Sequence, residues 1–302
     1  MAFEHLLKAG QLAGSLVIPP KPKALGVILP GSGPTDRNGN GPNNLGLHTD
    51  AYRKLALGLA EARIASFRAD KRGIGASGGE GNAVTLDDYV ADCGLWLQLL
   101  ATSKAANDFP SLPVGLPIWL IGHSEGGIIA MSAAKRLLVH GVVLLCCPGR
   151  PLGKVLIEQL SSDSQNLPHV AEVESVLNSL ERGQRADVAH LPPQLAGLFH
   201  PSVQGFWASL LRNKPDDLIA ALSCPILIIG GGKDLQVPAI DSRRLASHAQ
   251  QPLVRIFSEM NHVLTDVLSN VRQDNLSTYT NPALPLSLEL LPMIAQFILK
   301  RL

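Results

Sequence analysis

The segment that most constrains the fold runs Ile118-Trp119-Leu120-Ile121-Gly122-His123-Ser124-Glu125-Gly126-Gly127-Ile128-Ile129-Ala130-Met131. Its apolar beginning predicts a buried strand and its end predicts a helix, so Ser124 falls on the turn between them. Such a sharp turn strains the serine backbone and crowds the positions two before and two after it, where only small residues fit. This accounts for Gly122 and Gly126. A serine held in this way is typical of a catalytic nucleophile.

The same G-x-S-x-G pattern occurs a second time, as Gly75-Ala76-Ser77-Gly78-Gly79. A loop precedes this match, and the glycines that follow the serine cannot begin a stable helix. We therefore expect Ser77 to be a loop residue and Ser124 to be the nucleophile. The alternative for Ser124 is an ordinary serine on a tight turn.

A serine nucleophile needs a base, and the base needs a carboxylate that orients it. Among the histidines downstream of Ser124, His262 alone lies in a loop just after a late predicted strand, Leu253–Phe257. We therefore predict that His262 is the base. A histidine that serves only the loop is the alternative.

The orienting acid is expected at the end of the preceding strand. The apolar run Ile226–Ile229 leads through glycines into Asp234, which places that carboxylate at a strand terminus. Asp241 belongs to the next predicted helix, and Asp266 lies beyond the base. The order serine, aspartate, histidine is the order found in α/β hydrolases.

A tetrahedral intermediate also needs fixed backbone N–H donors. One donor is expected at Glu125, the residue after the nucleophile, and the second at Ser32, in the loop Leu29-Pro30-Gly31-Ser32-Gly33-Pro34. Gly31 or Gly33 could replace Ser32 through a shift of one residue. Nucleotide binding by this glycine-rich loop is disfavoured, because no Lys-Ser/Thr pair follows it and no G-x-G-x-x-G is present.

Predicted strands and helices alternate along most of the chain, which indicates a three-layer α/β fold with a mostly parallel central sheet. At the start, Ser15–Ile18 and Ala24–Leu29 flank a proline-rich segment and predict an antiparallel hairpin. Residues 151–222 contain no convincing strand and many apolar residues. We therefore expect a helical cap insertion there, with a core domain formed by residues 1–150 and 223–302.

Composition limits the classes of partner. The 302 residues carry a net charge of +1, so neither nucleic acid nor an anionic membrane is expected as a partner. The four cysteines lack a C-x-x-C pair, so no metal is expected. The N-terminus lacks a basic region followed by an apolar one, and the longest apolar runs are strand-length, which favours a cytoplasmic protein. The oligomeric state stays open.

On the basis of four features, the sequence resembles the α/β-hydrolase superfamily. More narrowly, it resembles bacterial carboxylesterases with a Pro-Gly-Ser-Gly-Pro oxyanion segment. The four features are the run Pro30–Asn40, the loop Asp70–Ser77, the turn around Ser124, and the Asp234/His262 pair. The resemblance implies a cofactor-free hydrolase of small-molecule esters, with a helical cap and a preference for small acyl groups. It also treats the loop Asp70–Gly73 as structural, tied to Asp36 or Arg37. A direct contact of Arg72 with substrate is the alternative.

Three hypotheses on function follow. The first is ester hydrolysis through a Ser124 acyl-enzyme. The second keeps the same triad but cleaves a peptide, thioester, lactone or carbon–carbon bond. The third is a ligand-binding protein that retains the fold without turnover, since fold alone does not fix function.

Overall fold

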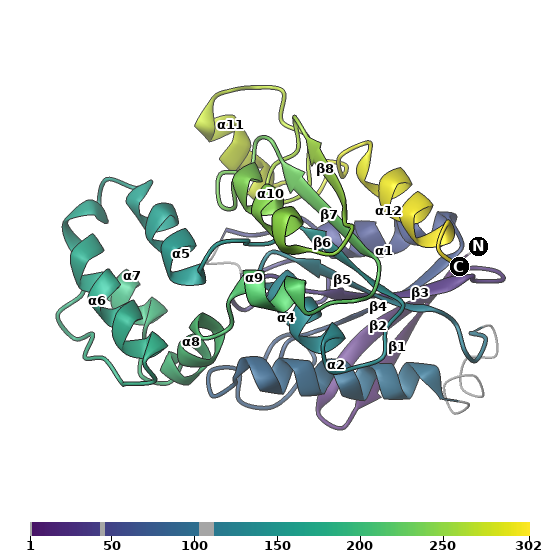
Figure 1. Ribbon diagram of the computed structural model, residues 1–302, viewed down its shortest axis with the longest axis horizontal. Helices are drawn as coiled ribbons and strands as arrows, with labels where there is room; N and C mark the ends of the chain where they lie inside the picture. The colour runs from purple at the N-terminus through teal and green to yellow at the C-terminus, as the bar shows by residue number, and fades with distance from the viewer. Residues whose placement is uncertain (1, 43–45, 103–111) are drawn as a thin grey trace.

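The computed structural model describes residues 2–42, 46–102 and 112–302. Its described strands form one eight-stranded sheet in the order β1-β2-β4-β3-β5-β6-β7-β8 (Figure 1). In this order, every neighbouring pair from β4 to β8, including those made by β3, is parallel. Strand β2 pairs antiparallel with β1 and with β4. The strands are β1 (Phe3–Ala9), β2 (Leu12–Ile18), β3 (Ala24–Leu29), β4 (Ile64–Ala69), β5 (Ile118–His123), β6 (Gly141–Leu145), β7 (Ile226–Gly231) and β8 (Leu253–Phe257).

Helices cover both faces of this sheet (Figure 1). One face packs against α1 (Ala51–Glu61) and α12 (Leu290–Leu299). The other packs against α2 (Leu86–Ala101), α4 (Glu125–Ala134), α9 (Pro215–Ala220) and α10 (Ala239–His248). Two short helices, α11 (Arg272–Ser277) and η3 (Thr278–Thr280), lie between β8 and α12. The predicted three-layer α/β fold is confirmed.

Strand β5 shows why the apolar runs are nearly continuous. Successive side chains of a strand point to opposite faces. Ile118 and Leu120 accordingly pack in the core cluster under α2 and α4, while Trp119 and Ile121 pack in the cluster under α1 and α12. A strand covered on both faces needs apolar residues at every position, and burying each such side chain stabilises the fold by about 1.5–3 kcal/mol.

The predicted hairpin at the start of the chain is wrong. Strand β2 does not pair with β3, because β4 lies between them and pairs with both. The hairpin partner of β2 is instead β1, which the sequence analysis missed. Two apolar residues of β1, Phe3 and Leu6, are exposed. The segment after Ile18 therefore connects two non-adjacent strands, and its prolines mark a crossing and not a tight turn.

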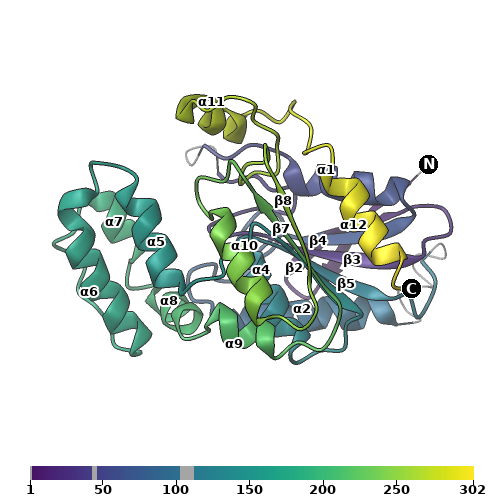
Figure 2. The same cartoon turned by 45° about the horizontal axis from the view of Figure 1, so that its top comes forward.

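The long interval between β6 and β7 is helical. It contains α5 (Leu152–Ser161), η2 (Leu167–His169), α6 (Val170–Glu181), α7 (Pro193–Leu198), α8 (Gln204–Leu211) and α9. Figure 2 shows α5 to α8 standing to one side of the sheet, and they share an apolar cluster of their own. Helix α9 packs instead in the main core, against α4 and α10. No helix in the described part of the chain is long and apolar enough to cross a bilayer.

Candidate active site

Ser124 occupies the turn between β5 and α4 with a strained backbone. Its φ of 53° and ψ of −126° are unusual for a residue with a side chain. A Cβ at Gly122 would lie 2.3 Å from the Gly126 carbonyl oxygen, and one at Gly126 would lie 2.2 Å from the Leu29 carbonyl oxygen. Both glycines are thus required by close backbone approach, which leaves the serine hydroxyl at the carboxyl edge of the sheet.

The structure brings the three residues of the predicted triad together. His262 Nε2 lies 3.1 Å from Ser124 Oγ, and His262 Nδ1 lies 2.9 Å from Asp234 Oδ2. Asp234 follows β7 and His262 follows β8, so parallel strands carry both groups to the edge where β5 ends. All three residues are buried. The arrangement can transfer the serine proton to the imidazole.

Asp234 is held as an ionised acceptor. Its second oxygen accepts hydrogen bonds from the Gln236 and Val237 amides, each at 2.8 Å. Burial raises the pKa of Asp234, but His262 and these two amides outweigh burial, so the pKa lies below its ordinary value. An ionised Asp234 accepts from the Nδ1–H of His262 and leaves the Nε2 lone pair facing Ser124.

The two competing aspartates lie elsewhere. Asp241 accepts the Gly149 and Arg150 amides at 2.9 Å each and pairs with the Arg150 side chain, which joins α10 to the loop after β6. Asp266 accepts the Leu288 amide at 3.2 Å. Neither carboxylate contacts His262 among the described residues.

The loop that carries Ser32 lies against the nucleophile. A Cβ at Gly31 would lie 3.2 Å from Ser124 Cβ. The Gly31 amide is already used, because it donates to Tyr52 Oη at 2.8 Å, whereas the Ser32 amide has no acceptor among the described residues. Glu125 is the first residue of α4, where amides lack intrahelical acceptors. Gly33 adopts a φ of +74°, which bends the loop.

A buried network behind the triad was missed by the sequence analysis, which assigned no role to Tyr52. The Tyr52 hydroxyl lies 2.8 Å from His123 Nδ1, and His123 Nε2 lies 2.8 Å from the His262 carbonyl oxygen. Burial, with a smaller effect of His262, lowers the pKa of His123 to about 3, so the ring is neutral. Nε2–H therefore donates to His262, and Nδ1 accepts from Tyr52. The network joins the Ser32 loop, the serine turn and the base loop.

The loop after β4 is tied to its neighbours through Asp70, and the expected partner Arg37 is present. Asp70 accepts the Arg37 amide at 2.8 Å and the Ala76 amide at 2.9 Å. Asp36 instead accepts amides within its own loop. Arg72 forms two bonds with Asp92, at 2.8 and 2.7 Å, so its guanidinium is directed toward α2 although the residue lines the cavity beside Ser124.

The second serine motif has a structural role. Ser77 lies in a loop, as expected, and is buried. Its hydroxyl accepts from the Ala13 amide at 2.9 Å and donates to the Asp70 carbonyl at 3.0 Å. The hydroxyl thus anchors the loop to β2.

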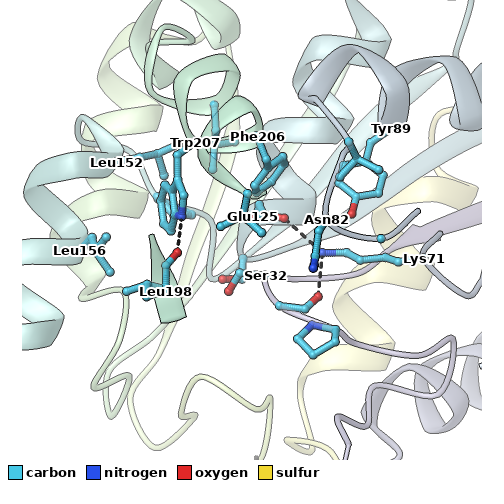
Figure 3. Close-up of a pocket in the computed structure, with 18 of the residues that line it drawn as sticks. Ser32, Lys71, Asn82, Tyr89, Glu125, Leu152, Leu156, Leu198, Phe206 and Trp207 are labelled. Carbon is cyan, nitrogen blue, oxygen red and sulfur yellow. Dashed lines mark hydrogen bonds and ion pairs between the residues drawn. The ribbon is translucent and has the colours of Figure 1, made fainter. Parts of the chain in front are cut away.

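Two cavities meet at Ser124. The larger, about 480 Å³, is lined mainly by apolar side chains, many of them from α5, α7 and α8 (Figure 3). The Trp207 indole N–H donates to the Leu198 carbonyl at 2.8 Å and so joins α8 to α7 in the wall of this cavity. The smaller, about 250 Å³, is lined by His262, Tyr279 and other polar residues.

One group of possible metal ligands stands out among the described residues. Cys146, Asp234 and His262 have ligand atoms within 4.8 Å of one another. The facing atoms of Asp234 and His262 are already bonded to each other. A metal ion there would have to displace that bond.

Comparison with known proteins finds similarity to esterases and related hydrolases. The model of the serine aminopeptidase S33 family (Hydrolase_4) matches residues 44–162, a range that contains Ser124 but neither Asp234 nor His262. Esterase EstD of Thermotoga maritima is 28% identical over 261 residues, covering 84% of this chain and 58% of EstD. The chain thus spans less than two thirds of that relative. A monoacylglycerol lipase of Mycolicibacterium smegmatis is 26% identical over 215 residues, covering 66% of this chain and 70% of the lipase.

Solved structures share the fold along nearly the whole chain. The Pyrococcus furiosus esterase Pf2001 has a TM-score of 0.59 at 14% identity, covering 99% of this chain and 91% of that one. Est1E of Butyrivibrio proteoclasticus has a TM-score of 0.56 at 15% identity, covering 98% of each chain. These likenesses establish the fold. Taken with the sequence matches and the serine turn at the edge of the eight-stranded sheet, they show that the chain has the α/β-hydrolase fold and is similar to bacterial esterases.

Proposed function

We propose that the protein is a serine carboxylester hydrolase that works through a Ser124 acyl-enzyme. One observation carries the proposal: His262 lies within hydrogen-bond reach of Ser124 Oγ on one side, at 3.1 Å, and of Asp234 on the other, at 2.9 Å. This is the arrangement in which a histidine takes up the serine proton as the oxygen attacks.

The mechanism follows from the groups around the serine. His262 removes the proton as Ser124 Oγ bonds to the ester carbonyl carbon, and the amides of Ser32 and Glu125 receive the oxyanion. The N-terminus of α4 adds a favourable dipole. His262 then gives the proton to the departing alcohol, which breaks the ester bond. A water molecule activated by His262 releases the acid from Ser124.

The ester bond is favoured by the names of the curated relatives, an esterase and a monoacylglycerol lipase. The S33 family name, serine aminopeptidase, favours peptide hydrolysis as the second candidate. Both reactions use the same triad, so substrate tests must separate them.

We assign one half of the ester to each of the two cavities. His262 must reach the leaving oxygen to protonate it, so the alcohol belongs in the smaller cavity that His262 lines. The acyl group then occupies the cavity of about 480 Å³ under α5, α7 and α8, which act as its cap. A cavity of that size suits longer acyl chains than the small groups that the resemblance implied.

The test uses p-nitrophenyl esters of increasing acyl length, with a peptide p-nitroanilide and a thioester as competitors. We expect kcat/KM to rise about fourfold for each added methylene until the cavity is full, because each buried methylene contributes about 0.8 kcal/mol. Ser124→Ala should lower kcat/KM at least about a thousandfold, while Ser77→Ala, from the second motif, should retain wild-type kcat.

Near-wild-type ester hydrolysis by Ser124→Ala would refute the proposal. Faster turnover of the peptide than of the esters would favour the aminopeptidase hypothesis. A folded sample that does not react with a fluorophosphonate would favour a ligand-binding protein without turnover.

A further inference from the structure

Lys71 is a buried cation beside Ser124 that the mechanism above does not use. Its side chain is 6% exposed and the side chain of Glu125 is 7% exposed. Figure 3 shows Lys71 reaching from the loop after β4 toward Glu125 and the Ser32 loop. Its ammonium also lies 5.2 Å from the centre of the Tyr89 ring. A lysine is rarely buried unless its charge is paired, so this placement calls for a specific role.

The ammonium binds both segments that carry the proposed oxyanion donors. Lys71 Nζ donates to the Gly31 carbonyl at 2.6 Å and to the Gly33 carbonyl at 3.2 Å. It also lies 3.2 Å from Glu125 Oε1. The first two contacts flank Ser32, and the third holds the side chain of the residue after the nucleophile.

The contact with Gly31 bears directly on the Ser32 amide. The Gly31 carbonyl and the Ser32 N–H belong to one planar peptide unit, and the chain contains no cis peptide among the described residues. In a trans peptide these two groups point in opposite directions. An ammonium on the carbonyl therefore directs the N–H away from Lys71, and it polarises the peptide so that the N–H becomes a stronger donor.

The contact with Glu125 removes an electrostatic conflict. A buried carboxylate on the residue whose amide faces the oxyanion would repel the negative charge that develops in the transition state. The ammonium of Lys71 balances that carboxylate. One cation thus serves both sides of the oxyanion site.

We propose that Lys71 is the positioning residue of the oxyanion site: it aims the Ser32 amide at the substrate oxygen and neutralises Glu125. This inference rests on the proposed ester hydrolysis. Lys71 also lines the cavity beside Ser124, but its proposed role is exerted through the two amides.

The experiment compares Lys71→Met, which keeps an apolar stem of similar length, with the wild type. Rates on a p-nitrophenyl ester are measured together with inhibition by an octyl trifluoromethyl ketone. Ser124 Oγ adds to the carbonyl carbon of that ketone, its proton passes to His262, and the resulting oxyanion occupies the same site as in the reaction. Loss of one oxyanion donor costs about 100- to 1,000-fold, and a misdirected donor costs less. We expect kcat to fall about 10- to 100-fold, KM to stay within about twofold, and the ketone to bind more weakly by the same factor as kcat.

Lys54→Met is the matched control. Lys54 Nζ also donates to two carbonyl oxygens, those of Thr49 at 2.7 Å and Leu284 at 2.6 Å, which do not line the cavities at Ser124. Its loss tests whether removing such an ammonium affects kcat through general destabilisation. We expect kcat and ketone affinity to be unchanged.

Two further variants cover the case in which Lys71→Met does not fold. Lys71→Arg keeps the positive charge. Glu125→Gln weakens the ion pair and should lower kcat about threefold or more without raising KM. Lys71→Arg should therefore retain a higher kcat than Glu125→Gln. Wild-type kcat and ketone affinity in Lys71→Met, or in Glu125→Gln if Lys71→Met does not fold, would overturn the inference. Loss of activity in Ser124→Ala would still support the proposed function, so the two failures are distinguishable.

Discussion

Acidification should destabilise the fold through one buried ring, His123. Tyr52 donates to its Nδ1, and its Nε2–H donates to the His262 carbonyl. Burial, and then the nearby His262, lowers its pKa from 6.5 to about 3. The unfolded chain therefore takes up a proton below about pH 6.5, while the native ring stays neutral. The difference between the two pKa values therefore costs no free energy of unfolding above pH 6.5. Below pH 6.5 it lowers the free energy of unfolding progressively, until the pH reaches about 3.

The magnitude follows from the shift. Each pH unit between the two pKa values is worth about 1.4 kcal/mol, so at about pH 5 the loss is about 2 kcal/mol. Over the whole window the loss approaches about 5 kcal/mol. Asp234, whose pKa is also lowered, contributes with the same sign but at lower pH.

The assay is urea unfolding followed by tryptophan fluorescence at pH 7, 6 and 5. The comparison variant is His123→Gln, whose amide can accept from Tyr52 and donate to His262 but does not titrate. We expect the wild type to lose about 2 kcal/mol more than the variant between pH 7 and pH 5. Equal losses in the two proteins would refute the assignment of His123 as a buried neutral ring. If the variant does not fold, an NMR titration of the wild-type histidines should show one ring that stays neutral at pH 5.

Three further predictions concern single side chains. Asp234→Asn should lower kcat about ten-thousand-fold with little change in stability. The oxygen of the asparagine can still accept from both amides, while its NH₂ group imposes the wrong tautomer on His262. Activity within tenfold of the wild type would contradict this. Ser77→Ala should lower the free energy of unfolding by about 1–3 kcal/mol, measured by urea titration, because a buried amide loses its acceptor, while kcat stays constant. Gly31→Ala should lower kcat about 10- to 100-fold, because the new methyl would lie 3.2 Å from Ser124 Cβ and displace the nucleophile. An unchanged kcat would show that the loop can move away from Ser124 without loss of activity.

Much of the fold could be predicted because its signals are local. The strand β5, the glycines around Ser124 and the helix after it are adjacent in the chain, so steric demands at the turn are visible in the residues themselves. The positions of Asp234 and His262 follow from a topological rule: parallel strands end at one edge of the sheet, so groups just after β7 and β8 arrive beside the end of β5.

The error at the N-terminus shows where local signals stop. The prolines after Ile18 are equally compatible with a hairpin turn and with a crossing to a distant strand. The insertion of β4 between β2 and β3 decides between them, and β4 begins more than forty residues farther along the chain. Strand pairing depends on which edges meet in space, and short-range composition does not encode that.

The sequence alone determined the fold class and named Ser124, Asp234 and His262 as neighbours. Only the tertiary structure decided what surrounds them: the Tyr52–His123 network, the Lys71 contacts and the cavity under α5, α7 and α8. These features join residues with no common motif or periodicity, and each depends on a side chain filling space left by others. A strained turn is determined by adjacent residues and can be recognised from them. A buried hydrogen bond or a cavity exists only once the packed elements enclose it.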